Sequence, residues 1–213
     1  MERLAIFDVD YTLTKRETLT ELYLFMLKKN PKLLKYIPRV ILTGILYGFK
    51  VYDARKAKEA FIKFLEGINE EEMQELVKEF YEKRLSKILY KDAIDTIKKL
   101  KSEGCKIYLI SASPEMYLNE LYNIKEVDKI LGTRLRKENG IYKSIIEGEN
   151  NKGEEKVRRL KEVLKRENIE VDYENSYMFS DSLADLPLFE LVGNPYLINY
   201  RKKHDKIKIL KWK

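Results

Sequence analysis

Two aspartates separated by a single residue follow the first apolar run of the chain. Residues 4–7 read Leu-Ala-Ile-Phe, and Asp8 and Asp10 come directly after them. A short run of bulky apolar residues is typical of a buried strand, and open α/β sheets bind ligands at the carboxyl ends of their strands. Two carboxylates this close repel one another unless a cation lies between them, and Mg²⁺ is a common cation for oxygen ligands. The pair therefore predicts a metal site, with a turn or a helix cap as the simpler alternative.

Two later apolar runs also end in polar side chains that suit such a site. Ser111 follows residues 105–110, and Asp181 follows residues 176–179, with Asp185 four positions further along the chain. A spacing of four at the start of a helix places both aspartates on the same side of that helix. If the strands are parallel neighbours, their ends meet at one edge of the sheet, so we expect these side chains to lie beside the first aspartate pair.

The charged helix predicted for residues 153–168 adds a lysine to this edge, either Lys152 or Lys156. Carboxylates can hold Mg²⁺, whereas a hydroxyl, an ammonium and helix N-terminal amides bind phosphate. One carboxylate can attack phosphorus and form an aspartyl-phosphate, and a second can protonate the leaving alkoxide and then activate water. The residues therefore predict phosphoryl chemistry, and a phosphotransferase or mutase would use the same groups as a phosphatase.

The order of the predicted elements indicates an α/β fold with an insertion. Residues 15–85 carry apolar side chains at helical spacing and contain no strand candidate, whereas short apolar strands alternate with helices in the later part. A hairpin is predicted at Asn139–Gly140, a pair that favours a tight turn. The alternation predicts a Rossmann-like parallel sheet with helices on both faces. We expect a catalytic core formed by residues 1–14 and 86–213, and an all-helical cap formed by residues 15–85.

These residues, taken in order, resemble the motifs of the haloacid dehalogenase superfamily, in its phosphoserine-phosphatase-like subfamily IB. The first motif, D-x-D-x-T, stands at residues 8–12, and the second, a Ser or Thr after an apolar strand, is Ser111. The third is the lysine near a helix start in residues 152–157, and the fourth is D-x-x-x-D at residues 181–185. Residues 193–199 also resemble this branch, so the resemblance covers essentially the whole chain.

The resemblance implies a role for each aspartate. Asp8 would be the nucleophile and Asp10 the general acid and base, and an aspartate at position 10 favours phosphoryl transfer over dehalogenation. Mg²⁺ would be held by Asp8, the carbonyl oxygen of Asp10 and Asp181, with Asp185 as a further ligand or a neighbour of the ligands. The expected activity is therefore a Mg²⁺-dependent phosphatase that acts through an aspartyl-phosphate.

The resemblance also implies which groups bind the phosphoryl group. Ser111 and one lysine would hold its oxygens. The pattern G-E-E-K-V favours Lys156, whereas the pattern K-G-E of phosphoserine phosphatases points to Lys152. The lysine that is not used would then be a solvated charge at the start of its helix.

Substrate choice would lie in the cap, where this chain departs from phosphoserine phosphatases. Glu17 stands where those enzymes carry a glutamate for the substrate amine, although a charge at a helix N-terminus explains it equally well. Their cap arginine aligns near Phe61, with Arg55 as an offset substitute, and Ser111 is followed by Ala-Ser rather than by two glycines. We expect a small phosphorylated substrate, with phosphoserine and lipid or glycerol phosphates as specific alternatives.

One apolar stretch of the predicted cap suggests a different role. Residues 32–50 form a broad apolar surface with Lys35, Arg39 and Lys50 at its edges. The stretch is too short to span a bilayer, but a basic amphipathic helix can lie on a membrane surface. The favoured expectation is that its apolar side is buried within the cap and that only its edges are solvated.

The composition limits the other functions. The 213 residues include 42 Lys and Arg against 35 Asp and Glu, which gives a net charge of +7. With Cys105 and His204 alone of their kinds, an internal disulfide and a multi-histidine zinc site are excluded. The positive charge is scattered among acids, so no nucleic acid is expected, and a basic module for RNA or lipid surfaces ranks below an enzyme. The chain begins directly with a strand, so we expect no signal peptide and a cytoplasmic protein.

Overall fold

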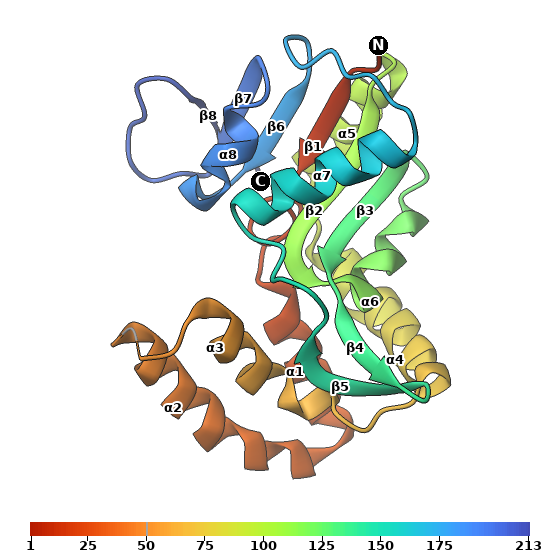
Figure 1. Cartoon of the computed structure of the whole chain (residues 1–213), viewed down its shortest axis with the longest axis vertical. Coiled ribbons are helices and arrows are strands. Elements are labelled where there is room, and N and C mark those ends of the chain that lie inside the picture. The colour runs from red at the N-terminus through yellow and green to blue at the C-terminus, as the bar shows by residue number, and fades with distance from the viewer. Residues whose placement is uncertain (50) are drawn as a thin grey trace.

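The computed structural model describes residues 1–49 and 51–213, and it has an α/β part and a helical part (Figure 1). The main sheet contains six parallel strands in the order β3-β2-β1-β6-β7-β8. These strands are β1 (Leu4–Phe7), β2 (Lys106–Pro114), β3 (Val127–Thr133), β6 (Tyr177–Ser180), β7 (Asn194–Ile198) and β8 (Lys208–Leu210). The predicted Rossmann-like parallel sheet is confirmed.

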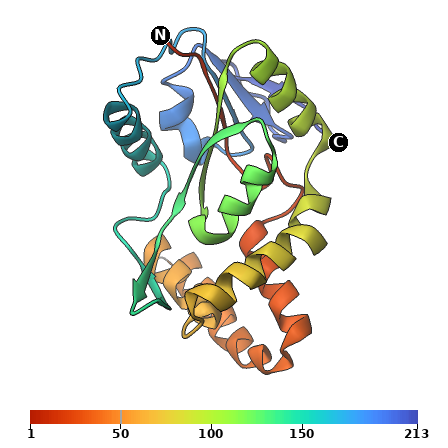
Figure 2. The ribbon, with the colours of Figure 1, turned by 90° about the vertical axis from the view of Figure 1, so that its right-hand side faces the viewer.

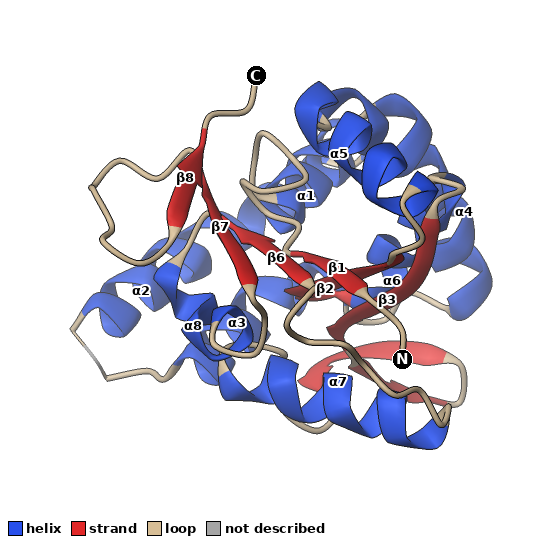
Figure 3. Cartoon of the chain, turned by 90° about the horizontal axis from the view of Figure 1, so that it is seen from above, coloured by secondary structure: helices blue, strands red, loops and turns tan. Residues whose placement is uncertain are grey.

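Strand β1 lies inside the sheet and is buried on both faces. Its side chains alternate between two apolar clusters, with Leu4 and Ile6 in one and Ala5 and Phe7 in the other. The helices that cover the faces are α7 (Glu154–Arg166) and α8 (Leu186–Phe189) on the first side and α5 (Lys91–Ser102) on the second (Figure 3). A strand covered on both faces carries a continuous apolar run, so an acid, Asp8, follows only where the strand leaves the sheet.

The helical part lies between β1 and β2 in the sequence and fills the lower half of Figure 1. Its elements are α1 (Thr18–Lys29), η1 (Pro31–Tyr36), α2 (Ile37–Gly48), α3 (Ala54–Phe61), η2 (Ile62–Leu65), α4 (Glu70–Lys83) and η3 (Leu85–Ile88). Helix α4 begins after Asn69, because the Asn69 side chain accepts a hydrogen bond from Glu72 N and an acidic first turn follows. The described residues of this segment form no strand, and the exact division into core and cap stays a prediction.

A buried glutamate connects the two ends of the helical segment. Glu21 in α1 is 4% exposed, and its two carboxylate oxygens each lie 3.0 Å from a guanidinium nitrogen, of Arg16 and of Arg84. Arg16 stands where the chain enters the segment, and Arg84 where it leaves. The paired charges therefore hold the entering and leaving chains together, and breaking one pair would leave a buried charge uncompensated.

The hairpin predicted at Asn139–Gly140 is present, and it packs against the helical segment (Figure 2). Its strands are β4 (Leu135–Glu138) and β5 (Ile141–Ile146). Asn139 and Gly140 have φ angles of 50° and 74°, which a two-residue hairpin turn of this kind requires. The backbone of Tyr142 donates to Ile68 O and accepts from Gly67 N, at 2.9 and 3.0 Å. The hairpin thus contacts the cap, although the predicted division places it in the core.

The C-terminal part differs in detail from the apolar pattern. That pattern predicts one helix over residues 183–192, but the structure has η5 (Leu183–Asp185) followed by the short helix α8. Pro187 is the second residue of α8 and has no N–H to donate to a preceding turn, so η5 and α8 do not form one continuous helix. The pattern also predicts residues 196–198 as the last strand, whereas β8 follows it at the sheet edge. After β2 the chain forms α6 (Glu115–Leu118) and η4 (Asn119–Asn123).

Gly193→Ala is expected to destabilise this end of the sheet. An added Cβ would lie 2.0 Å from the carbonyl oxygen of Glu174, and the backbone is held in place because Gly193 N donates to Tyr173 O at 2.9 Å. We expect the free energy of unfolding, measured by urea denaturation, to fall by about 1–3 kcal/mol.

Gly44→Ala is the matched control, because nothing lies within 4 Å of a Cβ added at that position in α2. It should be neutral or stabilising by up to about 1 kcal/mol, the helix preference of Ala over Gly. Equal stability of the two variants would contradict the close approach at Gly193.

Candidate active site

The register of the sheet brings the predicted motifs to one edge. Strand β1 pairs with β2 on one side and β6 on the other, and Phe7 lies opposite Leu109 and Phe179. Asp8 therefore leaves the sheet between the end of β2 and the end of β6, where Asp181 follows. The convergence expected from parallel strand ends is found in the structure.

A pocket of about 580 Å³ lies at this edge, between the strand ends and α3 of the helical segment. The predicted site residues that line it are Asp8, Asp10, Glu17, Lys152, Lys156, Asp181 and Asp185. Ser111 is the exception: it does not line the pocket, and its neighbours Ala112 and Ser113 do.

Lys156 lies between two buried carboxylates. Its ammonium donates to Asp8 Oδ1 at 2.7 Å and to Asp185 Oδ2 at 2.9 Å, and Asp185 Oδ1 lies 2.7 Å away. The exposed fractions of Lys156, Asp8 and Asp185 are only 2%, 8% and 4%. The Ser180 hydroxyl donates to Asp185 Oδ2 at 2.7 Å and fixes that carboxylate from β6. Lys152, by contrast, is exposed at the pocket mouth, so Lys156 is the lysine that the geometry places against the aspartates.

Burial controls the proton affinities of this group. Burial raises the pKa of Asp8, opposed by the Lys156 charge and reinforced by Asp185 and Asp10. Burial alone would lower the pKa of Lys156, but Asp8 and Asp185 raise it above its ordinary value, so the amine stays protonated. Burial also raises the pKa of Asp181 to about 6, with the Asp185 charge adding to it. Burial and mutual repulsion thus disfavour the ionised forms of Asp8 and Asp181, and a bound cation would favour them.

The donor set fits Mg²⁺ by its chemistry. In residues 1–49 and 51–213, no three His, Cys, Asp or Glu side chains are already arranged around one centre. Mg²⁺ does not need such a cage, because it is commonly bound by one or two carboxylates with waters and other oxygens completing its shell. Asp8, Asp181 and the carbonyl oxygen of Asp10 can supply these oxygens. Asp185 is already bonded to Lys156 and Ser180, which suits a residue that orients the lysine.

Asp10 is held by hydroxyl and amide groups rather than by a lysine. Its Oδ1 accepts from both Thr18 N and Thr18 Oγ1 at 2.7 Å, and its Oδ2 accepts from Ser113 Oγ at 2.6 Å. Thr18 is the first residue of α1, and Ser113 lies near the end of β2. Tyr117 OH lies 2.9 Å from Thr18 Oγ1 and donates to it, since the Thr18 hydroxyl proton goes to Asp10. The sequence analysis did not identify Thr18, Ser113 or Tyr117, whose only signal is a hydroxyl close to a motif.

Ser111 lies behind the pocket surface. It is 1% exposed, and its Oγ accepts a hydrogen bond from Ser113 N at 3.0 Å. The side chain of Asn151 donates to Ser111 O and to Leu131 O, both at 2.9 Å, and so fixes the ends of β2 and β3 together. Ser111 thus shapes the loop that faces the pocket, and its contact with phosphate stays a prediction.

Lys58 in α3 is a pocket residue that the sequence analysis missed. Its ammonium donates to Ala112 O, to Asn150 Oδ1 at 2.9 Å and to Thr133 Oγ1 at 3.2 Å, which links the cap to the strand ends. Burial lowers the pKa of Lys58 to about 8, although the charges of Asp10 and Glu17 oppose this shift. The signal available in the sequence was only one lysine among many.

Glu17 both caps α1 and lines the pocket. Its carboxylate accepts from Leu19 N at 3.3 Å and from Thr20 N at 2.6 Å, which is the expected N-cap arrangement. Burial raises its pKa, and the Asp10 charge adds to this shift. Arg55 does not line the pocket: its guanidinium donates to Ile146 O at 3.0 Å on the hairpin. The two interpretations of Glu17, as the N-cap of helix α1 and as a pocket residue, are therefore compatible.

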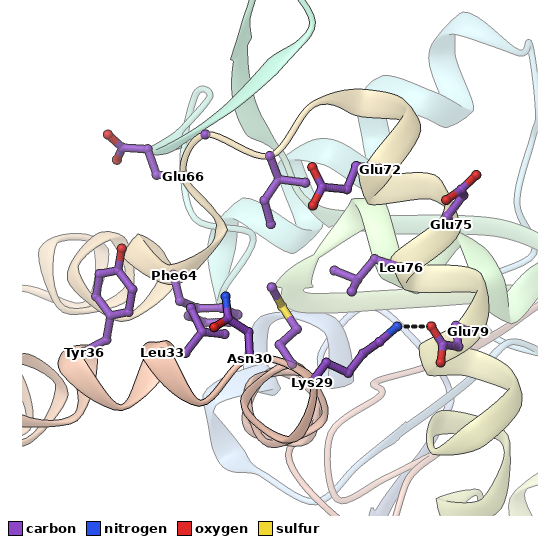
Figure 4. Close-up of a pocket in the computed structure, with 13 residues that line it drawn as sticks. Lys29, Asn30, Leu33, Tyr36, Phe64, Glu66, Glu72, Glu75, Leu76 and Glu79 are labelled. Atoms are coloured by element: carbon purple, nitrogen blue, oxygen red, sulfur yellow. Dashed lines mark hydrogen bonds and ion pairs between the residues drawn. The ribbon is translucent and has the colours of Figure 1, made fainter.

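A second pocket, of about 470 Å³, lies within the helical segment and not at the strand ends (Figure 4). Its apolar floor includes Leu33, Phe64 and Leu76, and its glutamates are Glu66, Glu72, Glu75 and Glu79. Lys29 pairs with Glu79, as the dashed line in Figure 4 shows. An acid-rich rim repels a phosphate group, so this pocket does not compete with the site at Asp8.

Comparisons with known proteins agree with this fold. The family model of haloacid dehalogenase-like hydrolases matches residues 5–190. Protein CicA from Caulobacter vibrioides is 26% identical over 161 residues, which make up 75% of this chain and 72% of that protein.

Solved structures share the architecture at low identity. A protein of unknown function from Bordetella pertussis Tohama I has a TM-score of 0.84 and 23% identity, with 94% of this chain and 92% of that chain covered. A phosphoserine phosphatase, solved as a phospho-aspartyl intermediate analogue, has a TM-score of 0.64 and 20% identity, with 94% and 88% covered. At these identities the structures show a common fold.

Lys156→Met should be much more harmful to stability than Lys152→Met. Removing the ammonium leaves Asp8 and Asp185 buried without a counter-charge, which costs about 3–5 kcal/mol, whereas an exposed lysine contributes within about 0.5 kcal/mol. Urea denaturation of both variants in a buffer with chelator, so that no divalent cation replaces the ammonium, measures the difference. Similar losses in the two variants would show that Lys156 does not compensate these carboxylates.

Proposed function

The chain belongs to the haloacid dehalogenase-like hydrolase family, and on this basis we propose that it is a Mg²⁺-dependent phosphatase that hydrolyses a small phosphate monoester. The observation that carries the proposal is the contrast between two neighbouring aspartates. Asp8 lies buried against Lys156, whereas Asp10 is held by the hydroxyls of Thr18 and Ser113. Such a contrast supports different chemical roles for two carboxylates of one site.

Asp8 is the nucleophile of the first step. Lys156 contacts Asp8 through Oδ1, so we assign the attack on phosphorus to Oδ2. The new Asp8–phosphorus bond forms as the ester P–O bond breaks, and the leaving alkoxide takes a proton from Asp10. The products of this step are the free alcohol and an aspartyl-phosphate on Asp8.

Asp10 acts in the opposite sense in the second step. Its carboxylate takes a proton from a water molecule, which attacks phosphorus and breaks the Asp8–phosphorus bond. Inorganic phosphate leaves, and both aspartates return to their starting states. The hydrogen bonds from Thr18 and Ser113 fix the orientation of the Asp10 carboxylate in both steps, because each holds a different oxygen. Thr18 in the cap donates to Oδ1, and Ser113 in β2 donates to Oδ2.

Positive charge at the phosphoryl group comes from Lys156. The pKa of this amine is raised by Asp8 and Asp185, although burial opposes them, so it remains charged near the reacting oxygens. Mg²⁺, held by Asp8, Asp181 and the Asp10 carbonyl oxygen, would supply the further positive charge that lets one anion approach another. Ser111 is proposed to bind the phosphoryl group through its hydroxyl, which accepts a hydrogen bond from Ser113 N and keeps its own proton to donate.

The cap residues Lys58 and Glu17 are proposed to contribute to substrate choice. Both belong to the helical segment and line the pocket, and they carry opposite charges. Arg55, the offset substitute for a carboxylate-binding arginine, is bonded to the hairpin instead. These contacts favour a phosphate monoester in general over phosphoserine in particular.

Asp8→Asn should abolish turnover of p-nitrophenyl phosphate with Mg²⁺, because an amide is a poor nucleophile. We expect a loss of at least about three orders of magnitude in kcat. Excess EDTA should abolish wild-type activity, and added Mg²⁺ should restore it. Asp95→Asn, an exposed position on α5, is the matched control and should retain wild-type activity. Activity that persists both in EDTA and in the Asp8→Asn variant would contradict the proposed mechanism.

Deprotonation of Lys58 is expected to raise KM at alkaline pH. Its pKa of about 8 means that the ammonium is present below that pH and is lost as the pH rises through it. The charged groups around it are Asp10, Glu17, Lys152 and Lys156, so its loss makes the pocket less attractive to a phosphate dianion. We expect KM for p-nitrophenyl phosphate to increase several-fold across this interval, with a smaller change in kcat.

Lys58→Arg separates this effect from other titrations, since a guanidinium keeps its proton throughout. Its KM should stay flat over the interval, whereas Lys58→Met should show a high KM at every pH. Parallel pH profiles of wild type and Lys58→Arg would exclude Lys58 as the titrating group.

A further inference from the structure

Helix α2 presents an apolar face to the outside of the molecule. Ile41, Leu42, Ile45 and Phe49, at and just after the end of this helix, are 58%, 56%, 49% and 79% exposed. These are large exposures for such side chains, and they are concentrated on one element of the cap. In both Figure 1 and Figure 2, α2 forms the outer, lower edge of the molecule, away from the sheet.

The spacing shows that this is one continuous face. Pro38, Ile41, Leu42, Ile45 and Phe49 stand at positions i, i+3, i+4, i+7 and i+11, which places them on the same side of a helix. The face that packs on the protein includes Thr43, which is 5% exposed. The helix is therefore apolar outward, and the expectation that its apolar side is buried within the cap is wrong.

The charged residues of the chain segment that carries this face all have one sign. From residue 30 to residue 52 the sequence contains four lysines and arginines and no Asp or Glu, in a chain that has 35 acids. Lys32, Lys35 and Arg39 are exposed, and Lys50, the fourth, lies outside the described residues. Exposed Leu34 continues the apolar surface into η1. Exposed apolar side chains flanked by basic residues fit a bilayer of anionic lipids, which has an apolar interior and negatively charged headgroups.

We propose that the α2 face, defined as Leu34, Ile41, Leu42, Ile45 and Phe49 with the rim of Lys32, Lys35 and Arg39, docks on an anionic lipid bilayer. At 12 residues, α2 is about 18 Å long, shorter than the roughly 30 Å hydrocarbon core. The helix therefore lies in the plane of the interface, with its apolar side chains among the acyl chains and its basic rim at the headgroups. Among the described residues, no helix is long and apolar enough to cross a membrane.

A lipid surface suits this face better than a protein partner does. The face lies on α2 and the preceding η1 at the edge of the molecule, whereas protein partners usually insert anchors into pockets. The α2 face is lined by aliphatic residues and one Phe, and its own segment, residues 30–52, contains no acid that could pair with a basic partner. Its charge complements anionic headgroups, each basic residue adding attraction at the surface.

Docking would bring the active site close to the membrane. Helix α3 packs beside α2 and contributes Ala57, Lys58 and Phe61 to the pocket. The lipid contact itself needs neither Asp8 nor Mg²⁺, so it is independent of the proposed function. A variant such as Asp8→Asn should bind vesicles as the wild type does even if it hydrolyses nothing.

The test is co-sedimentation of the full chain with vesicles. Vesicles of phosphatidylcholine containing a minority of phosphatidylglycerol should sediment the wild type at low salt, and pure phosphatidylcholine vesicles should sediment much less. Ile41→Ser combined with Ile45→Ser should lower the bound fraction by about tenfold or more, because apolar burial is lost. Ile145→Ser, at another exposed isoleucine on β5, is the matched control and should bind normally.

Two further variants keep the result interpretable. Lys35→Glu with Arg39→Glu should abolish the preference for anionic vesicles. Phe49→Trp should show a blue-shifted emission on adding anionic vesicles, against the constant background of buried Trp212. Circular dichroism and thermal melting confirm that each variant is folded.

The proposal fails if wild type does not bind anionic vesicles, or if the α2 substitutions leave binding unchanged. It also fails if sedimentation equilibrium shows a dimer that the Ile41→Ser, Ile45→Ser variant dissociates, because the face would then be covered by a second copy of the chain.

Discussion

The ammonium of Lys156 between Asp8 and Asp185 is the contact on which the site depends. The three side chains come from the start of α7, the end of β1 and η5, and all three are buried. Each carboxylate would be costly to bury alone, and the lysine compensates both. The positions of these three elements are therefore coupled: a displacement of α7 from the sheet would leave two anions without a counter-charge. The same requirement places positive charge where a phosphoryl group would be bound.

Asp10 occupies a different environment although it is only two residues away from Asp8. It is surrounded by donors from α1 and from β2, with Tyr117 next in the chain of hydrogen bonds. Thr18 is the first residue of α1, so the orientation of Asp10 is set by where the cap begins. The separation of an ion-paired aspartate from a hydroxyl-bonded one depends on the turn after β1, where Tyr11 adopts a φ of 57°. Two carboxylates close in sequence thereby acquire separate surroundings.

The sequence predicted the parts of this arrangement that depend on strand ends, and it failed where the cap meets the core. Parallel strands and their terminal aspartates follow from short apolar runs. The choice between Lys152 and Lys156 depends on the turn at Gly153, with a φ of 59°, which no periodicity encodes. Lys58 and Ser113 were missed because each reaches the pocket through the packing of two distant segments. The pattern of α2 showed an apolar face, but whether another element covers that face is decided by tertiary structure alone.

The position of β1 in the topology affects how this protein is made. β1 lies between β2 and β6, whose first residues, Lys106 and Tyr177, emerge from the ribosome long after it. At synthesis rates of about 5–20 residues per second the interval between Asp8 and Asp185 is roughly ten to thirty seconds. During that time an apolar strand with two open edges is exposed while the cap helices, built from local contacts, can already form. The nascent chain thus carries its proposed nucleophile long before Asp185, which completes the site, has been synthesised.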